Sequence, residues 1–279
     1  MSSFPAAADA YGKQQALDGA LAEMASVVVA FSGGVDSSYL ALRAHRVLGE
    51  RALAVTADSE SLAASQRGIA LDLARRFGFA HRMVRTLELR NPRYARNDAE
   101  RCYHCKSELF QQLMPLAAEL GLRHVAYGLI ADDLTDFRPG RRAAEEAGVR
   151  SPLAETGLTK ADVRLLSRAM GLPTWDLPAS PCLSSRVAYG LPVTAPVLRQ
   201  VERAEDALRA LGFREYRVRH LGRSARVEIA PEELPRLADA GLRSAVEAAV
   251  RQAGYAEVQI DAQGYRRGRL NELRVVSSP

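Results

Sequence analysis

The amino-acid sequence predicts an α/β protein with a doubly wound, mostly parallel sheet and a smaller C-terminal α/β domain. Three observations support this prediction. Short apolar segments alternate with helical patterns from residue 26 to residue 172, as in successive βαβ units. The apolar segments are continuous rather than alternating, which is typical of strands buried on both faces. After a proline-rich stretch at 173–194, a second set of helix and strand patterns begins.

In the first part of the chain, strands are expected in short apolar runs, and helices where apolar residues recur every three or four positions. The expected strands are 26–31, 51–57, 81–89 and 123–130. The expected helices are 37–48, 61–78, 105–121 and 158–172. Gly78 ends the second of these helices, and Thr159 with Asp162 forms the N-terminal cap of the last one.

The C-terminal part is expected to form a small α/β unit. Its expected helices are 197–212, 231–241 and 243–254, and its expected strands are 216–222, 225–230 and 256–262. We therefore divide the chain into a first domain, 1–178, a linker loop, 179–194, and a small domain, 195–279.

Composition restricts the class of protein. The 279 residues are 47% hydrophobic, with a net charge of +5 and a pI near 9.3, which suits a folded protein with a phosphorylated substrate and does not exclude RNA. No apolar run reaches bilayer length, and the N-terminus lacks the pattern of a secretory signal. A cytoplasmic enzyme without a membrane partner is therefore expected. Three cysteines, an odd number, argue against a disulfide framework.

The segment SVVVAFSGGVDSS leads from an apolar strand through two glycines into a helix. Such a turn presents backbone N–H groups at a positive helix end, where an anion can bind. The glycines allow close approach, the serines add hydroxyl donors, and an aspartate beside phosphate would bind Mg²⁺ or orient the loop. The alternative is a simple strand-to-helix turn. The segment is neither a Walker loop nor a Rossmann glycine motif.

The string SGGVDSS resembles the pyrophosphate loop of the N-type ATP pyrophosphatases, the PP-loop superfamily with its adenine nucleotide alpha hydrolase-like fold. This resemblance implies that ATP is cleaved between its α and β phosphates and that the substrate becomes an adenylate. Ammonia or sulfur then attacks the adenylate. The implied residues for ATP and pyrophosphate, with Asp36 also catalytic, are Ser32, Gly33, Gly34, Asp36, Ser37 and Ser38.

The cysteines favour sulfur as the attacking atom. Cys102 and Cys105 stand three apart before a helix, and Cys182 lies in the linker loop. Three cysteines with an open fourth position suit a [4Fe–4S] cluster that carries an extra sulfur. Zinc is less suited, because His104, the fourth ligand, lies inside the C-x-x-C. In a simpler interpretation, Cys182 attacks the adenylate alone and gives up its own sulfur. Inert thiols are the remaining alternative.

Several stretches together resemble the LarE family of ATP-dependent sulfur transferases. They are AFSGGVDSSYLA, NPRYARNDAERCYHCK, ADDLTDFRPGRRAAEEAGVRSPL, SPCLSSRVAYG, YRVRHLGRSARVEI and GYRRGRLNE. The resemblance implies an enzyme that adenylates pyridinium-3,5-biscarboxylic acid mononucleotide with Mg-ATP and converts its carboxylates to thiocarboxylates. This reaction belongs to the synthesis of the nickel-pincer cofactor of lactate racemase.

The same resemblance implies how sulfur is supplied. Members with one cysteine sacrifice the residue that matches Cys182. Members with the extra C-x-x-C bind a [4Fe–4S] cluster, here through Cys102, Cys105 and Cys182. A sulfide source and a homo-oligomer, with a hexamer favoured, are also implied. The first domain would carry out adenylation, and the small domain would bind substrate or form the oligomer.

Cationic and acidic residues supply further candidates for binding the substrate, Mg²⁺ or the nucleotide. Arg217 and Arg219 share one face of a strand, and Arg186 follows Cys182 by four residues, so these arginines suit a dicarboxylate phosphate. The segment ADDLTDFRPG follows a strand end, where doubly wound sheets bind ligands. Each candidate has a simpler alternative as a surface charge or helix cap. The full set is Arg101, Lys106, Asp132, Asp133, Arg138, Arg186, Arg217 and Arg219.

Three other functions compete with this one. A PP-loop tRNA thiolase with a [4Fe–4S] cluster would need an RNA surface, yet residues 195–279 carry fifteen arginines against twelve acidic residues and no lysine cluster. A nucleic-acid partner is therefore not expected. An amide-forming synthetase needs no set of cysteines, and a zinc-binding interaction module needs no phosphate loop.

Overall fold

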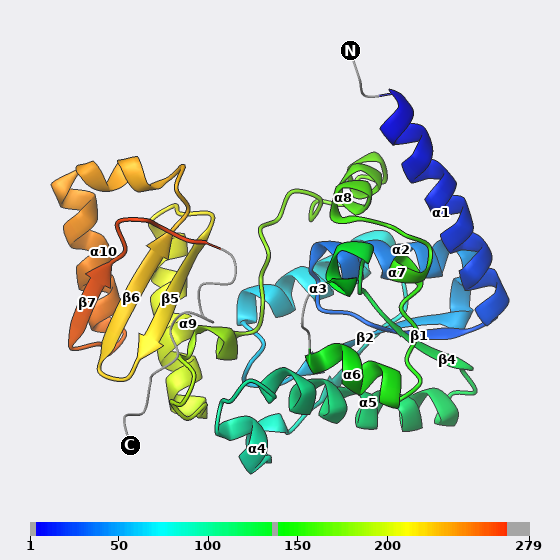
Figure 1. Ribbon diagram of the computed structural model, residues 1–279, viewed down its shortest axis with the longest axis horizontal. Coiled ribbons are helices and arrows are strands. Elements are labelled where there is room, and N and C mark those ends of the chain that lie inside the picture. Colours follow the sequence, from blue (N-terminus) through cyan, green and yellow to red (C-terminus); the bar gives the residue numbers. More distant parts are fainter. Residues whose placement is uncertain (1–3, 136–138, 267–279) are drawn as a thin grey trace. The chain divides into compact units, whose positions relative to one another are not determined.

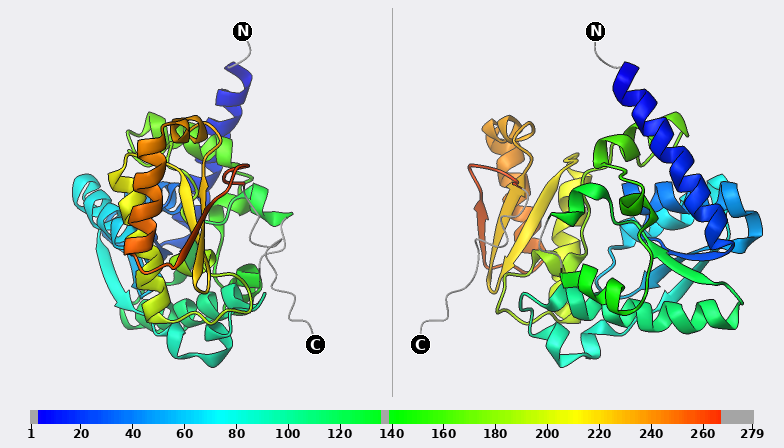
Figure 2. Two further views of the ribbon diagram at one scale, coloured as in Figure 1. Left: turned by 90° about the vertical axis from the view of Figure 1, so that its left-hand side faces the viewer. Right: turned by 45° about the vertical axis from the view of Figure 1, so that its right-hand side comes forward.

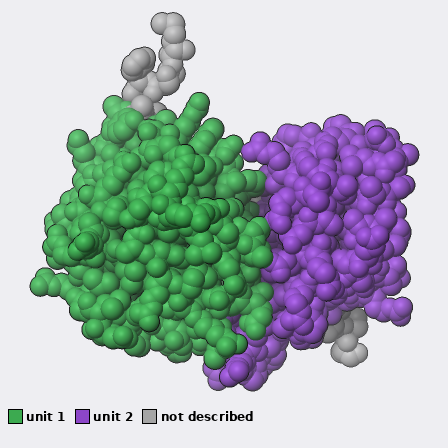
Figure 3. Space-filling model, turned by 180° about the vertical axis from the view of Figure 1, so that it is seen from behind, with its two compact units in different colours: residues 1–87, 102–180 green, residues 88–101, 181–279 purple. Residues whose placement is uncertain are grey.

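The computed structural model describes residues 4–135 and 139–266 of the chain. The chain forms two compact units, which Figure 3 colours separately. Unit 1 comprises Met1–Leu87 and Cys102–Ser180, and unit 2 comprises Glu88–Arg101 and Pro181–Pro279. The segment 88–101 thus groups with the C-terminal residues, which the sequence did not indicate. The domain roles and boundaries given above stay a prediction.

Unit 1 is built on a four-stranded parallel sheet. Its strands are β1 (Val27–Ala30), β2 (Ala52–Asp58), β3 (His81–Arg85) and β4 (His124–Tyr127), in the order β3-β2-β1-β4. Alternate side chains of the central strand point to opposite faces, as a pleated strand requires. Val27 and Val29 join one hydrophobic cluster, while Val28 and Ala30 join another. The predicted parallel sheet, buried on both faces, is confirmed.

Helices cover both faces of this sheet (Figure 1). One face packs against α1, α2, α3 and α8, and the other packs against α5 and α6. The bounds are α1 (Phe4–Met24), α2 (Val35–Leu48), α3 (Ala64–Phe77), α5 (Arg101–Glu119), α6 (Pro139–Glu146), α7 (Pro152–Glu155) and α8 (Lys160–Ala169). The predicted capping box of α8, formed by Thr159 and Asp162, is present. In the described part of the chain, no helix has the length and apolarity needed to span a membrane.

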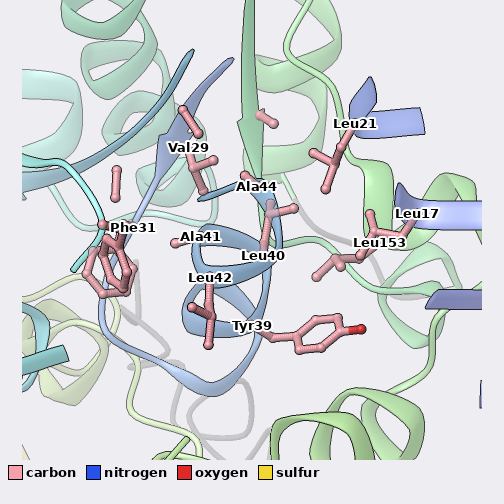
Figure 4. Close-up of a cluster of buried hydrophobic side chains, with 14 of the residues drawn as sticks. Leu17, Leu21, Val29, Phe31, Tyr39, Leu40, Ala41, Leu42, Ala44 and Leu153 are labelled. Atoms are coloured by element: carbon pink, nitrogen blue, oxygen red, sulfur yellow. The ribbon is translucent and has the colours of Figure 1, made fainter. Parts of the chain in front are cut away.

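Helix α1 was not predicted from the sequence. It lies along the outside of unit 1 in the right-hand view of Figure 2. Its apolar stripe includes Leu17 and Leu21, both fully buried, which gather with Leu40 of α2 and Leu153 of α7 (Figure 4). This stripe fixes α2, and with it the loop that precedes α2.

Unit 2 contains a three-stranded sheet in the order β5-β6-β7. Strands β5 (Tyr216–Leu221) and β6 (Ser224–Ile229) are antiparallel, and β7 (Glu257–Ile260) is parallel to β6. Helices α9 (Ala195–Ala210) and α10 (Ala240–Gln252) complete its core, and α4 (Pro92–Ala95) belongs to the early segment. The predicted helix at 231–241 is wrong, since only the 3₁₀ turn η5 (Leu234–Ala238) forms there. Pro231 and Pro235 remove two N–H donors from this stretch.

Candidate active site

The candidate site of unit 1 lies where the strand order reverses. Strands β2 and β4 flank β1 on opposite sides, so the carboxyl ends of β1 and β4 form the switch point at which doubly wound sheets bind ligands. Loop 31–34 follows β1, and the 3₁₀ turn η3 (Ala131–Leu134) follows β4. Gly128 allows their close approach, because a Cβ there would lie 2.9 Å from the backbone nitrogen of Ser37.

The loop after β1 leads directly into a helix that no side chain caps at its first position. Gly33 has φ of +74° and Gly34, the N-cap of α2, has extended backbone. A glycine has no side chain with which to bind the N–H groups of the first turn. These N–H groups and the positive end of the helix dipole therefore favour an anion at this position.

Serine hydroxyls brace the loop from within. The hydroxyls of Ser32 and Ser37 are 3.1 Å apart, and Ser37 Oγ donates to the Gly34 carbonyl at 3.2 Å. Ser32 is exposed, whereas Ser38 is fully buried. The hydroxyl of Ser38 has no hydrogen-bond partner in the part of the chain that the structure describes. Ser32 thus lies at the loop surface, whereas Ser37 and Ser38 are buried beneath it.

Asp36 forms the strongest polar contact of the loop. Its two carboxylate oxygens accept hydrogen bonds from Lys160 Nζ at 2.6 and 2.5 Å. Burial raises the pKa of Asp36 above its ordinary value, and the nearby charge of Asp133 adds to this, while Lys160 and Arg164 oppose it. Asp132, the neighbour of Asp133 in η3, accepts a 2.7 Å hydrogen bond from the backbone nitrogen of Lys160.

Three side chains from β2, β3 and α3 support the loop from the other side. Gln66 of α3 donates to the carbonyl of Ser32 at 2.8 Å. Thr56 of β2 donates to the carbonyl of Phe31 at 2.7 Å and lies 2.8 Å from Nε2 of His81. Because the single hydroxyl proton of Thr56 is used on Phe31, His81 Nε2 is the donor in the second contact. Burial lowers the pKa of His81.

The C-x-x-C pair lies in the first turns of α5, also in unit 1. Cys102 is exposed and Cys105 is partly buried. Lys106 Nζ lies over the rings of Phe110 and Tyr127, at 5.9 and 5.7 Å from their centres. These cation–π contacts hold the lysine beside the pair of cysteines.

Unit 2 carries Cys182 on a short segment that buried arginines hold in place. Cys182 precedes the 3₁₀ turn η4 (Leu183–Arg186). Arg186 donates to the carbonyls of Pro181 and Cys182, and its other nitrogens form a two-point ion pair with Glu205 at 2.9 Å. Burial lowers the pKa of Arg186, but Glu205 more than compensates, and the charge of Cys182 also favours the protonated guanidinium.

Three further arginines in unit 2 complete this environment. Arg101 donates to the Ser184 carbonyl at 2.8 Å, and Arg219 donates to the Ser185 carbonyl at 3.0 Å and pairs with Glu228. Arg217 lies over the ring of Tyr265 at 4.6 Å, and its pKa is lowered by burial and by the charge of Arg186.

Two of these arginines form buried ion pairs. Arg186 pairs with Glu205, and Arg219 pairs with Glu228. Glu228 Oε1 is fully buried and lacks a hydrogen-bond partner among the described residues.

Comparisons with known proteins agree with this geometry. Residues 14–103 match the asparagine synthase family. The chain is 36% identical to pyridinium-3,5-bisthiocarboxylic acid mononucleotide synthase of Lactiplantibacillus plantarum over 263 residues, which is 93% of this chain and 94% of the relative. The chain belongs to the LarE family. Its fold is therefore the PP-loop ATP pyrophosphatase fold, with a small C-terminal sheet.

Two other relatives of this LarE-family chain have no described function. An uncharacterized protein of Synechocystis sp. is 45% identical over 252 residues, 90% of this chain and 94% of the relative. An uncharacterized protein of Methanocaldococcus jannaschii is 25% identical over 203 residues, 73% of this chain and 77% of the relative.

The structure brings together many of the residues predicted from the sequence, although their roles stay predictions. The loop residues of the LarE-family chain lie at the switch point with Asp132 and Asp133, and the four predicted arginines of unit 2 lie around the Cys182 segment. Arg138 lies outside the described residues. Sequence reasoning missed Lys160, Gln66, Glu205 and Glu228. Only Lys160 had a signal, as one of three lysines next to a helix cap.

The donor atoms present bear on the predicted metal sites. Among residues 4–135 and 139–266, no group of three or more His, Cys, Asp or Glu side chains is arranged to hold a metal ion. Cys102 and Cys105 alone do not make a complete cluster site, and Asp36 is engaged by Lys160. The [4Fe–4S] cluster and a protein-bound Mg²⁺ therefore stay predictions of the sequence, and no chemical step is derived through them.

Proposed function

We propose that this LarE-family chain is an ATP-dependent sulfur transferase of nickel-pincer cofactor synthesis. Its substrate would be pyridinium-3,5-biscarboxylic acid mononucleotide, whose carboxylates it would convert to thiocarboxylates. The observation that carries the proposal is the Cys182 segment, whose backbone carbonyls accept hydrogen bonds from the buried side chains of Arg186 and Arg219. The name of the relative from Lactiplantibacillus plantarum supports the product class.

The first reaction would take place at the loop of unit 1. A substrate carboxylate oxygen attacks the α phosphorus of ATP, the bond to the β-phosphate oxygen breaks, and pyrophosphate leaves. The N–H groups of the first turn of α2 would stabilise the charge that develops on pyrophosphate. Ser32 and Ser37 would fix the loop. Asp36 would hold the ammonium group of Lys160, which would face the phosphates.

The second reaction would use Cys182. Its thiolate attacks the acyl carbon of the adenylate, and AMP leaves with the bonding electrons. Loss of the Cα proton of Cys182 with cleavage of its Cβ–Sγ bond then releases the thiocarboxylate and leaves dehydroalanine. This sequence needs no oxidant or reductant. The guanidinium of Arg186, which donates to the Cys182 carbonyl at 3.1 Å, would hold the segment that carries this sulfur.

The alternative source of sulfur is a [4Fe–4S] cluster bound by Cys102, Cys105 and Cys182, fed by sulfide. The iron content and the mass of the purified protein distinguish between the cluster and Cys182 as the source of sulfur. Anaerobically purified protein with about four irons per chain would support the cluster. Iron-free protein that transfers sulfur once, with a mass loss at Cys182 equal to one H₂S, would support the sacrificial cysteine.

The decisive experiment incubates the full chain with Mg-ATP and the pyridinium dicarboxylate and measures pyrophosphate and thiocarboxylate. The wild type is expected to form both products. Cys182→Ala is expected to release pyrophosphate but form no thiocarboxylate, because only the second reaction needs the sulfur. Normal thiocarboxylate formation by this variant would remove Cys182 from the mechanism. Thiolation of tRNA in place of the small molecule would favour the tRNA thiolase alternative.

A further inference from the structure

The segment that carries Cys182 has little regular structure of its own. After Cys182 the chain forms the 3₁₀ turn η4 and then runs through residues 187–191 outside any named helix or strand. A backbone contact ties this stretch to β5, where the nitrogen of Ala188 donates to the carbonyl of His220 at 3.1 Å. Because the stretch lacks the repeated hydrogen bonds of a helix or sheet, the side chains that bind its backbone determine its conformation.

Asn97, from the early part of unit 2, binds this backbone with its side-chain amide. Its Nδ2 donates to three carbonyls, those of Ala188, Leu191 and Val187, at 2.8, 2.9 and 3.3 Å. Its Oδ1 accepts a hydrogen bond from the guanidinium of Arg101. Both polar atoms of the amide are therefore used, the nitrogen on the Cys182 side and the oxygen on its own side.

Two neighbours of Asn97 hold Ser184, which is closer to Cys182. The hydroxyl of Tyr94 lies 2.6 Å from the hydroxyl of Ser184, and Arg101 donates to the Ser184 carbonyl at 2.8 Å. The side chains of Tyr94 and Ser184 are both buried. These contacts all lie within unit 2, and they fix the backbone that begins two residues after Cys182.

Asn97 occupies a position that favours few other residues. Its φ is +60°, in the left-handed region that asparagine tolerates better than most residues with a side chain. The residue is fully buried, and burial of an amide is unfavourable unless its polar atoms are bonded. A buried polar group whose hydrogen bonds are satisfied gives its surroundings one defined conformation. The contacts of Asn97 therefore serve the conformation of the segment that it binds.

We propose that Asn97 is a positioning residue for sulfur transfer, whose amide holds the backbone after Cys182 in the conformation that this reaction requires. Tyr94 supports the same conformation through Ser184. The inference rests on the proposed function, since it assumes that Cys182 supplies or carries the sulfur. Sulfur transfer is sensitive to such positioning, because a displacement of about 1 Å can slow a reaction about 100-fold.

The test uses Asn97→Gly, because glycine adopts a φ of +60° without strain and the substitution removes only the side chain. The full chain is mixed with Mg-ATP and the pyridinium dicarboxylate, and pyrophosphate and thiocarboxylate are measured in a single turnover. Thiocarboxylate formation is expected to slow about 10- to 100-fold, while pyrophosphate release, at the loop of unit 1, changes less than about twofold. Amide hydrogen exchange of residues 183–191 is expected to become faster.

Asn91→Ala is the matched control. Asn91 lies in the same early segment and caps α4 by accepting a hydrogen bond from the backbone nitrogen of Arg93 at 2.9 Å. Its loss is expected to lower stability, as for any N-cap. Because this contact is made within the early segment, both reactions are expected to proceed as in the wild type.

Three results would overturn the inference and leave the proposed function intact: normal thiocarboxylate formation in Asn97→Gly, equal slowing of its two reactions, or the same slowing in Asn91→Ala. If Asn97→Gly does not fold, Tyr94→Phe takes its place, since it removes only the hydroxyl that contacts Ser184. Normal thiocarboxylate formation in that variant would then overturn the inference. A wild type that forms no thiocarboxylate would overturn both the inference and the proposed function.

Discussion

Gly128 and Gly33 enable the loop geometry in different ways. Residue 33 is a glycine because its φ of +74° lies in the left-handed region, where a side chain would be strained. Residue 128 is a glycine because the backbone of Ser37 packs against it. A Cβ at residue 128 would lie 2.9 Å from the backbone nitrogen of Ser37. The first glycine shapes the loop, and the second sets how closely the β4 end approaches α2.

Gly128→Ala is expected to displace the first turn of α2, because the contact is with backbone that cannot rotate away. We expect a loss of about 1–3 kcal/mol in the free energy of unfolding and weaker binding of Mg-ATP. Thermal unfolding and calorimetry measure the two effects.

Gly68→Ala is the control for this prediction. It is the same substitution within helix α3, where a Cβ would meet no atom within 4 Å, and it should stabilise the protein by up to about 1 kcal/mol. If both variants behaved alike, the close approach of Gly128 to Ser37 would not matter.

The sequence predicted the loop but not Lys160, whose side chain forms an ion pair with Asp36 of the first turn of α2. Ser32, Gly33, Gly34 and Asp36 are adjacent in the chain, so one local motif identifies them. Lys160 is 124 positions from Asp36, and the contact depends on how β1, β4 and α8 pack. Glu205 and Glu228 were missed because a glutamate in a helix or strand gives no sign in the sequence that it is buried.

At the scale of elements, α9 is joined to the Cys182 segment by an ion pair that is shielded from water. The side chains of Arg186 and Glu205 are 4% and 11% exposed. Removing one partner of such a pair leaves the other charge buried and unmatched. The helix, the 3₁₀ turn η4 and the backbone of β5 meet at this glutamate, since Glu205 also accepts from the nitrogen of Val218.

Glu205→Gln is therefore expected to lower the free energy of unfolding by about 3–5 kcal/mol. Asp206→Asn, one position further along α9, removes an ion pair with Arg209 whose two side chains are 46% and 48% exposed. Its expected cost is below about 1 kcal/mol. Urea unfolding of the two variants makes the comparison, and equal costs would show that burial of the Arg186–Glu205 pair does not determine its contribution.

At the scale of the whole molecule, burial lowers the pKa of one histidine in the described part of each unit, a partly buried one in unit 1 and a buried one in unit 2. Burial lowers the pKa of His81 in unit 1 and of His220 in unit 2 below the ordinary value of 6.5. The unfolded chain therefore binds protons at these sites at a higher pH than the folded chain does. Stability is fully present above pH 6.5 and decreases as the pH falls below that value.

His220→Phe is expected to reduce this acid sensitivity without abolishing it, because His81 remains. His220 contacts the Tyr255 hydroxyl at 3.2 Å, so some stability is also lost at every pH. The measurement is the difference in free energy of unfolding between pH 7.5 and pH 5.5. An unchanged difference would show that His220 does not contribute.

The central sheet of unit 1 was easier to predict than helix α1 or the grouping of residues 88–101 with unit 2, and the reasons are physical. Strands β1, β2 and β4 are short, mostly apolar runs, so their burial on both faces is visible in the sequence. Helix α1 was missed because its buried stripe is narrow, with Leu17 and Leu21 among polar residues and alanines. The assignment of residues 88–101 to unit 2 depends on long-range contacts, such as those that Asn97 makes with the carbonyls of Val187, Ala188 and Leu191.

This early segment has a consequence for synthesis on the ribosome. Residues 88–101 leave the exit tunnel about 80 residues before the first of their partners in unit 2, a delay of several seconds at about 5–20 residues per second. During that time Asn97 and Tyr94, both fully buried in the finished protein, have nothing of unit 2 to pack against. The nascent chain therefore carries this segment without its partners until residues 184–191 have emerged, and chaperone contact is expected there.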